Sequence, residues 1–195
     1  MLLVCTGNIC RSALAERLGR AYLDAALGER AAEVRLVSVG VGAVVGSGMH
    51  PDSALVLSGL GGDPSGFRAC QLVDGMAIDA DLTLTMTRAH RREVLTVAPR
   101  ALSRTFTLRE AADLVQLIGD DVDLPGEDLA ERARTLVRAM GAARSRRQGG
   151  AEDDDIPDPI GQPVEVHQEV GEAVAAALVV VLDRIVAVHQ VLPQA

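Results

Sequence analysis

The sequence predicts an α/β fold: a single domain over residues 1–195 in which a parallel sheet carries helices on both faces. Short apolar runs alternate with stretches of helical periodicity along most of the chain. The 195 residues, 48% of them hydrophobic, suit one domain with a full core. A glycine-containing loop directly follows the first apolar run, and parallel sheets bind ligands at such carboxyl ends of strands. We therefore expect the functional site near the N-terminus.

Strands are predicted at three short apolar runs, 2–4, 34–39 and 82–86. Helices are predicted over 13–27, where apolar residues recur every four positions, and over 53–60, between the start signal His50-Pro51-Asp52 and the turn at 61–64. Further helices are predicted over 89–97, 111–118 and 127–140, with a long final helix that has an apolar stripe over 166–188. Before this final helix, residues 144–155 carry a basic cluster and then an acidic one. We interpret this polar stretch as a flexible surface loop.

The composition excludes several classes of partner. The net charge of -8 argues against a surface for polyanions, and the absence of Trp leaves little aromatic surface on which bases could stack, so no nucleic acid is expected. The apolar run over 173–182 is shorter than the ~20 residues of a membrane span, so we expect a buried helix and no membrane partner. Three cysteines without a signal peptide indicate a reducing compartment, and we expect a cytoplasmic location.

A cysteine and an arginine, five residues apart, belong to the loop after the first predicted strand, Cys5-Thr6-Gly7-Asn8-Ile9-Cys10-Arg11-Ser12. A strand that runs through a glycine-containing loop into a helix turns successive backbone N–H groups toward one point, where an oxyanion fits. Arg11 supplies a planar fork of donors that suits two oxygens of a phosphate. The same positive field favours the thiolate of Cys5, which is the nucleophilic form.

The residues between Cys5 and Arg11 strengthen this interpretation. Gly7 permits close backbone approach, Asn8 tolerates a left-handed turn, and Ser12 can cap the helix and donate to the sulfur. The alternative is that Cys5 is a small buried hydrophobic residue and Arg11 a surface charge.

Five segments resemble the motifs of the low-molecular-weight protein tyrosine phosphatases. The segment over 4–12 resembles the phosphate-binding loop of that family, and the others lie at 38–42, 67–72, 80–88 and 156–161. The resemblance covers most of the chain, with an expanded stretch near 113–153.

The resemblance implies a central parallel four-stranded sheet and hydrolysis of phosphate monoesters through a covalent cysteinyl-phosphate on Cys5, with no cofactor. Phosphorylated proteins, through phosphotyrosine, or small aryl phosphates are the implied substrates. The residues that would hold the phosphate are Thr6, Gly7, Asn8, Ile9, Cys10, Arg11 and Ser12, with Ser38 in support. No metal is expected, because no histidine has a ligand spacing with cysteine. We interpret the four histidines as structural or surface residues, namely His50, His90, His167 and His189.

The general acid implied by the resemblance is Asp158, which precedes Pro159. Its carboxyl would protonate the leaving oxygen as the P–O bond breaks, and the proline favours an extended backbone at Asp158. The alternative is a solvated turn acid, since other aspartates lie at 153–155.

Cys10 stands where the family can have a cysteine that forms a disulfide with the nucleophile. The resemblance therefore implies that Cys10 is a redox partner of Cys5. The alternative is a partly buried thiol that only packs.

The chain departs from the family at the expected rim of the site. Ile160 follows the Asp-Pro pair, and Val44 and Val45 stand near a second position where the family commonly has an aromatic residue. Phe67 and Cys70 replace a histidine and an arginine that are common in the family, so a weaker polar network behind the loop is expected.

Three other functions remain open on the sequence. Protein arginine phosphatases of the same family carry Thr where this chain has Ile9, which favours an ester substrate here. An arsenate reductase would need further cysteines, but Cys70 is the only one outside the loop. A catalytically inactive oxyanion-binding module would need neither nucleophile nor acid.

Overall fold

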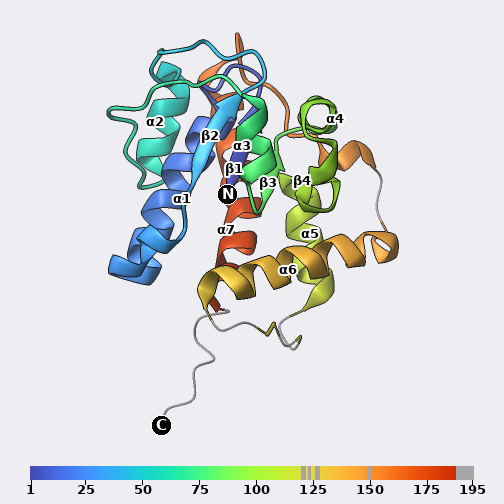
Figure 1. Ribbon diagram of the computed structural model, residues 1–195. Coiled ribbons are helices and arrows are strands. Elements are labelled where there is room, and N and C mark those ends of the chain that lie inside the picture. Colours follow the sequence, from blue (N-terminus) through green and yellow to red (C-terminus); the bar gives the residue numbers. More distant parts are fainter. Residues whose placement is uncertain (120–121, 123, 126–127, 149–150, 188–195) are drawn as a thin grey trace.

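Four parallel strands form the central sheet of the computed structural model, in the order β2-β1-β3-β4 (Figure 1). The strands are β1 (Leu2–Cys5), β2 (Val37–Gly40), β3 (Thr83–Thr85) and β4 (Thr105–Thr107). In the register of the sheet, Leu3 of β1 pairs with Ser38 of β2 on one side and with Leu84 of β3 on the other. The predicted four-stranded parallel sheet is confirmed, and the loop that begins after Cys5 leaves its carboxyl edge.

The structure describes residues 1–119, 122, 124–125, 128–148 and 151–187. Its α-helices in these ranges are α1 (Arg11–Leu27), α2 (Pro51–Gly59), α3 (Asp74–Asp79), α4 (Arg88–Val97), α5 (Leu108–Ile118), α6 (Leu129–Ala143) and α7 (Val164–Ala187). Short 3-10 turns, η1 to η4, lie at Gly28–Glu33, Pro99–Arg104, Arg144–Arg146 and Ala151–Asp154. Three positions named in the sequence analysis lie outside the described residues. They are residue 127, at the predicted start of one helix, residue 188, at the predicted end of another, and His189.

Side chains of β1 alternate between two cores, one on each face of the sheet. Leu3 and Cys5 belong to the larger core, which α1, α5 and α7 complete. Leu2 and Val4 belong to a smaller core together with side chains of α3 and α4. Helices therefore cover both faces, as the alternation of strand and helix predicts. The predicted stripe on α7 is buried within the larger core at Val170, Val174, Leu178, Leu182 and Ile185.

The short elements are those that the sequence pattern did not indicate. β4 has only three residues, and α3 has only six, so neither offers enough length for a periodicity to show. α5 begins three residues earlier than predicted, because Thr107 and Glu110 form a capping box at its start.

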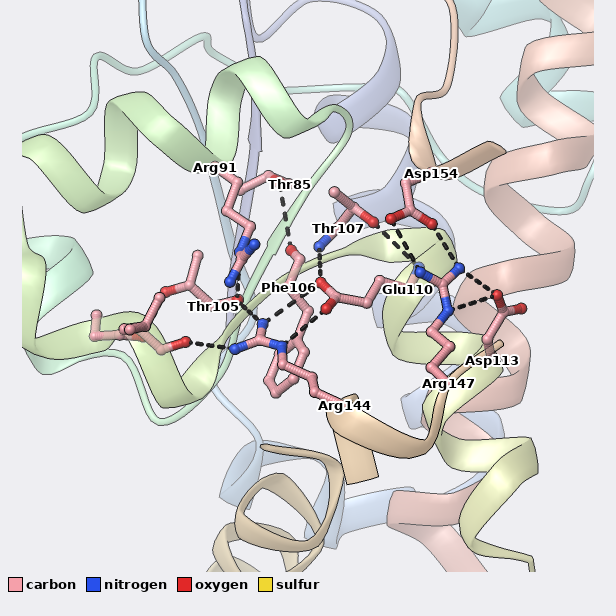
Figure 2. A network of polar contacts seen from close by, with 12 residues as sticks. Thr85, Arg91, Thr105, Phe106, Thr107, Glu110, Asp113, Arg144, Arg147 and Asp154 are labelled. Atoms are coloured by element: carbon pink, nitrogen blue, oxygen red, sulfur yellow. Dashed lines mark hydrogen bonds and ion pairs between the residues drawn. The ribbon is translucent and has the colours of Figure 1, made fainter. Parts of the chain in front are cut away.

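The segment expected as a flexible loop over 144–155 contains the two 3-10 turns Arg144–Arg146 and Ala151–Asp154 and is fastened to the domain by two arginines (Figure 2). The guanidinium of Arg144 lies over the Phe106 ring, 4.1 Å from its centroid, and donates to Glu110 over 2.8 Å. Arg147 donates to Asp154 over 3.0 Å and also pairs with Asp113. These contacts tie the described ends of the segment to β4 and α5.

Among the helices of the described residues, none combines the length and the apolar character that crossing a bilayer demands.

Candidate active site

The loop between β1 and α1 has its carbonyl groups bound by the segment that follows β2. Backbone N–H groups of Val41, Gly42 and Val44 donate to the carbonyl oxygens of residues 5, 6 and 7, each over 3.0 Å. The N–H of His50 donates to the carbonyl oxygen of Ile9 over 2.8 Å. Because a trans peptide points its N–H opposite to its carbonyl group, the N–H groups that follow these carbonyls face the other side of the loop.

Four successive N–H groups of the loop have no acceptor in the part of the chain that the structure describes. This holds for the backbone N–H of Gly7, Asn8, Ile9 and Cys10. Consecutive amides with free hydrogens, next to the start of α1 at Arg11, make a positive concavity suited to a tetrahedral anion.

Two residues make this tight loop geometry possible. Asn8 is the only non-glycine residue with a positive φ among those described, at 54°. At Gly40, a Cβ atom would lie 2.3 Å from the carbonyl oxygen of Thr6, so only glycine lets the end of β2 approach the loop this closely.

A polar network behind the loop centres on the fully buried side chain of Asn8. Its amide donates to the hydroxyls of Ser12 over 2.9 Å and of Ser38 over 2.8 Å, while its oxygen accepts from the N–H of Cys70 over 2.8 Å. Ser38 in turn donates to Glu16 over 2.5 Å. The network is closed despite the residue types at 67 and 70, because position 70 contributes through its backbone and Phe67 packs among apolar side chains.

Cys5 lies at the end of β1 with its sulfur 2.9 Å from the hydroxyl oxygen of Ser12. The cysteine is 2% exposed. Ser12 does not cap α1, contrary to the sequence prediction: the N-cap position belongs to Cys10, and Ser12 lies inside the first turn. Its hydroxyl faces the sulfur and also donates to the carbonyl oxygen of Val39 over 3.4 Å.

Arg11 projects a buried guanidinium toward the loop and toward the segment that precedes α7. One terminal nitrogen donates to the carbonyl oxygen of Ile156 over 3.0 Å, and the other donates to a carboxylate oxygen of Asp158 over 2.5 Å. The Nε atom is buried and has no partner among the described residues. The side chain of Arg11 is 3% exposed, whereas that of Asp158 is 44% exposed, so the carboxylate lies at the mouth of the site.

The chain before Asp158 is held in place from several sides. Asp155 accepts from the backbone N–H and from the guanidinium of Arg88 at the start of α4, over 2.7 and 3.0 Å. The N–H of Ile156 donates to the carbonyl oxygen of Met86 over 2.9 Å, just past β3. The Arg88 contacts keep the pKa of Asp155 below its usual range although partial burial opposes this. Asp155 thus holds this segment to α4, and Asp158 is the residue whose carboxylate contacts Arg11.

His90 belongs to the same site, although its sequence context indicated only a structural or surface residue. Its Nε2 lies 2.9 Å from the hydroxyl of Thr6 and its Nδ1 lies 2.9 Å from the hydroxyl of Thr87. Burial lowers the pKa of His90 to about 4, with the nearby Arg11 charge acting in the same direction. The imidazole is therefore neutral at pH 7. The signal that could have placed it is Thr87, which caps α4 by accepting from the His90 N–H.

The rim beside the loop is aliphatic, as the sequence suggests. Val44, Val45 and Ile160 are exposed. Val44 also lies close to Gly7, where a Cβ atom would meet its side chain at 3.7 Å. The three residues leave an apolar border with no aromatic ring.

Cys10, His50 and His167 come together, although their spacing in the sequence gave no sign of it. One ligand-type atom from each lies within 4.8 Å of the others. The sequence has no ligand spacing between a histidine and a cysteine, but the fold brings these two histidines beside Cys10. Contacts between α2, α7 and the loop, which linear spacing does not encode, bring them together.

Comparison with known proteins identifies relatives of the whole fold. The model of the family "Low molecular weight phosphotyrosine protein phosphatase" matches residues 1–126. A probable low molecular weight protein-tyrosine-phosphatase, EpsP of Ralstonia solanacearum, is 36% identical over 110 residues, which are 56% of this chain and 70% of that protein. Wzb of Salmonella typhi, a phosphatase of the same description, is 28% identical over 152 residues, 75% of this chain and 97% of that protein.

Two solved structures have the same fold. The low molecular weight protein tyrosine phosphatase of T. tengcongensis superposes with a TM-score of 0.65 at 26% identity, covering 93% of this chain and 96% of that one. The YwlE arginine phosphatase of Geobacillus stearothermophilus gives a TM-score of 0.64 at 26% identity, covering 97% and 91%. Together with the family match over most of the length and the loop that carries Cys5 and Arg11, these similarities show that the chain belongs to the low molecular weight phosphotyrosine protein phosphatase family.

Proposed function

We propose that this protein hydrolyses aryl phosphate monoesters, phosphotyrosine in proteins foremost, through a covalent phosphate on Cys5. The observation that carries the proposal is the convergence on one loop of a buried cysteine sulfur, acceptor-free backbone amides and the Arg11 guanidinium. A phosphoryl group has three peripheral oxygens, which these donors match in number and charge.

In the first step, the Cys5 sulfur attacks phosphorus while the bond from phosphorus to the tyrosine oxygen breaks. Asp158 gives its proton to the departing oxygen, so that a neutral phenol leaves. Ser12 donates to the sulfur, and Arg11 with the loop amides holds the three peripheral oxygens while charge builds on them. The carboxyl suits this role because it reaches the guanidinium from the exposed side of the site.

In the second step, water attacks the phosphorus of the cysteinyl-phosphate and the P–S bond breaks. Asp158, now ionised, takes a proton from the water, and inorganic phosphate leaves with the thiolate restored. The same donors serve both transition states, so the protein needs no rearrangement of its anion site between them.

The substrate class proposed is a phosphorylated protein or a small aryl phosphate. The aliphatic rim of Val44, Val45 and Ile160 can contact a phenyl ring by apolar packing without stacking. We propose a cytoplasmic site of action, where a reducing milieu keeps the Cys5 thiol available. Cys10, one residue before Arg11, is proposed to protect the nucleophile by forming a disulfide with it under oxidation.

Hydrolysis of p-nitrophenyl phosphate, combined with trapping of the intermediate, tests the proposal. We expect turnover in the wild type, recovery of phosphorus bound to Cys5 after a rapid acid quench, and neither in a Cys5→Ser variant. An active protein from which phosphorus is never recovered on Cys5 would contradict the covalent route, and an inactive one that still binds phosphate would indicate an anion-binding module.

Arginine phosphatase activity is the second candidate, favoured by the similarity to YwlE over 97% of this chain. Against it stands Ile9, where the arginine phosphatases have a threonine; an aliphatic side chain there favours an ester over an N-phosphate. Matched peptides that carry phosphotyrosine or phosphoarginine separate the two. A higher kcat/KM on the phosphoarginine peptide would replace the tyrosine assignment, and Ile9→Thr should move the ratio toward phosphoarginine.

A further inference from the structure

Three residues with metal-binding side chains meet beneath the end of the loop. Cys10 stands at the N-cap position of α1, His50 at the N-cap position of α2, and His167 in the first turns of α7. One ligand atom of each lies within 4.8 Å of the others. The two imidazole rings are stacked, with centroids 4.7 Å apart and planes inclined by 16°.

The two imidazoles carry ring nitrogens that lack a partner in the described structure. Nε2 of His167 and Nδ1 of His50 are both buried and accept or donate no hydrogen bond. The side chain of His167 is 0% exposed, and its other nitrogen, Nδ1, lies 2.9 Å from the Ser53 hydroxyl. A buried ring nitrogen without a partner is uncommon in folded proteins, because leaving it unpaired costs free energy.

A carboxylate stands next to both unpaired nitrogens. The Oδ2 atom of Asp52 lies 3.8 Å from Nδ1 of His50 and 4.0 Å from Nε2 of His167. These separations are too long for hydrogen bonds. Two ligands of a tetrahedral metal ion lie about 3.3 Å apart when each is roughly 2 Å from the ion, so the side chains would have to close by about half an ångström to share one. The group thus offers one sulfur and two imidazole nitrogens, and the Asp52 carboxylate lies beside the two nitrogens.

We propose that Cys10, His50 and His167 bind a zinc ion, with a water molecule as the fourth ligand. Zinc takes four ligands in a tetrahedron, and sulfur with imidazole nitrogen is a donor set that it favours over the hard cations Mg²⁺ and Ca²⁺. On binding, the S–H bond of Cys10 breaks, a bond from sulfur to zinc forms, and the proton passes to solvent. The step involves no change of oxidation state.

The protonation states of the ligands fit this step. Burial lowers the pKa of His167, and the neighbouring His50 acts in the same direction, so the imidazole is neutral and can bind a metal. Burial raises the pKa of the Cys10 thiol to about 11, against the opposing hydrogen bond from Ser53. Cys10 is therefore a thiol before zinc binds, and binding releases its proton.

The site joins the phosphate-binding loop to α2 and α7. A bound zinc ion would fix the Cys10 end of the loop and take the Cys10 thiol out of the proposed pairing with Cys5. Only this consequence depends on the proposed function; the binding of the metal does not.

Equilibrium dialysis against zinc in a metal-buffered solution tests the site. We expect one zinc ion per chain in the wild type and in the control variants Cys5→Ser and Cys70→Ser, which remove the two thiols outside the group. We expect His50→Gln to weaken binding by at least about 10-fold. Absence of zinc from the wild type, unchanged affinity in His50→Gln, or loss of zinc in Cys5→Ser would each overturn the proposal.

Cobalt substitution supplies a readout that does not depend on the folding of a histidine variant. In the double variant Cys5→Ser, Cys70→Ser the single remaining cysteine is Cys10. We expect Co²⁺ to give this protein a sulfur-to-cobalt charge-transfer band together with the intense visible bands of a tetrahedral site. A cobalt spectrum without the charge-transfer band would show that Cys10 is not a ligand and would overturn the site.

Discussion

At the scale of single residues, the site depends on side chains that each make more than one contact. Asn8 adopts a left-handed backbone conformation and also closes the hydrogen-bond network through Ser12 and Ser38. Arg11 binds the carbonyl oxygen of Ile156 and the carboxylate of Asp158 with its two terminal nitrogens. Substitutions at such positions should therefore change catalysis much more than they change stability, provided that the backbone is kept.

Asp158→Asn should lower kcat by ~10²–10⁴, because an amide cannot give a proton to the leaving oxygen. The loss should be largest for alkyl or phenyl phosphates and smallest for p-nitrophenyl phosphate, whose leaving group needs little protonation. Steady-state kinetics on a series of leaving groups measures this. Asp153→Asn, an exposed acid in the same segment, is the matched control and should keep the wild-type rate. Equal losses in both variants would remove Asp158 from the role of acid.

Cys10→Ser should make inactivation by peroxide irreversible. In the wild type, the oxidised sulfur of Cys5 can condense with the thiol of Cys10, and a dithiol reagent then restores the enzyme. Without Cys10, oxidation should proceed to the sulfinic acid. Activity recovered by dithiothreitol after graded peroxide treatment measures the effect, with Cys70→Ser, an exposed cysteine, as the control. Equal recovery in Cys10→Ser and the wild type would exclude a protective role.

At the scale of elements, the stretch between α6 and α7 is attached to the domain by side-chain contacts, and it places Asp158 in the site. Arg144 and Arg147 fix its first part on β4 and α5 (Figure 2), and Asp155 fixes its last part on the start of α4. The basic cluster followed by an acidic one, interpreted from the sequence as a polar loop, supplies both partners of the ion pair between Arg147 and Asp154.

Arg147→Leu should reduce the free energy of unfolding by about 1–3 kcal/mol, because the buried carboxylate of Asp154 would lose its charged partner. Urea denaturation measures the change. Arg146→Leu, which alters an exposed arginine one residue earlier, should shift stability by no more than about 0.5 kcal/mol. A similar loss in both variants would mean that net charge, and not the ion pair with Asp154, is responsible.

Long elements with a repeating pattern were predictable from the sequence, and so was β3, which has only three residues but lies within the apolar run over 82–86. The stripe of α7 and the helix over 11–27 repeat their pattern several times, whereas β4 and α3 are too short to repeat any. The start of α5 was also missed, since its capping box lies before the apolar pattern begins. The capping residues at the start of a helix have to be considered together with the periodicity of its apolar residues.

At the scale of the whole molecule, the parallel sheet collects groups from distant parts of the chain at one edge. The loop after β1 and the His90 region after β3 lie next to each other because β1 and β3 are neighbours in the sheet. His90 is buried between them as a neutral imidazole that bonds to Thr6 and Thr87. Protonation of the His90 imidazole should therefore change the stability of the whole protein.

Stability should fall as pH is lowered from 6.5 to about 4, and His90 should contribute up to about 3 kcal/mol of that loss. Within this window the unfolded chain binds a proton on His90 that the folded protein does not, since burial and the Arg11 charge lower the pKa in the fold. Above pH 6.5 the group is neutral in both states and contributes no pH dependence.

Thermal denaturation of the wild type and of His90→Gln over this pH range measures the contribution. The glutamine keeps hydrogen-bonding groups but does not titrate, so the decline in stability should be shallower in the variant. The lowered pKa of His167 acts in the same direction and remains in both proteins, so only the difference between them reports His90. Parallel curves would contradict a buried neutral His90.

The sequence by itself determined the fold class, the anion loop and the residues from Cys5 to Ser12, because these depend on contiguous residues and on patterns that repeat locally. The tertiary structure alone decided that Asp158, 147 positions away, reaches Arg11, and that Cys10, His50 and His167 form one group. Contacts between distant residues follow from the order of the strands and from how the helices pack across the sheet. Spacing along the chain carries no record of either.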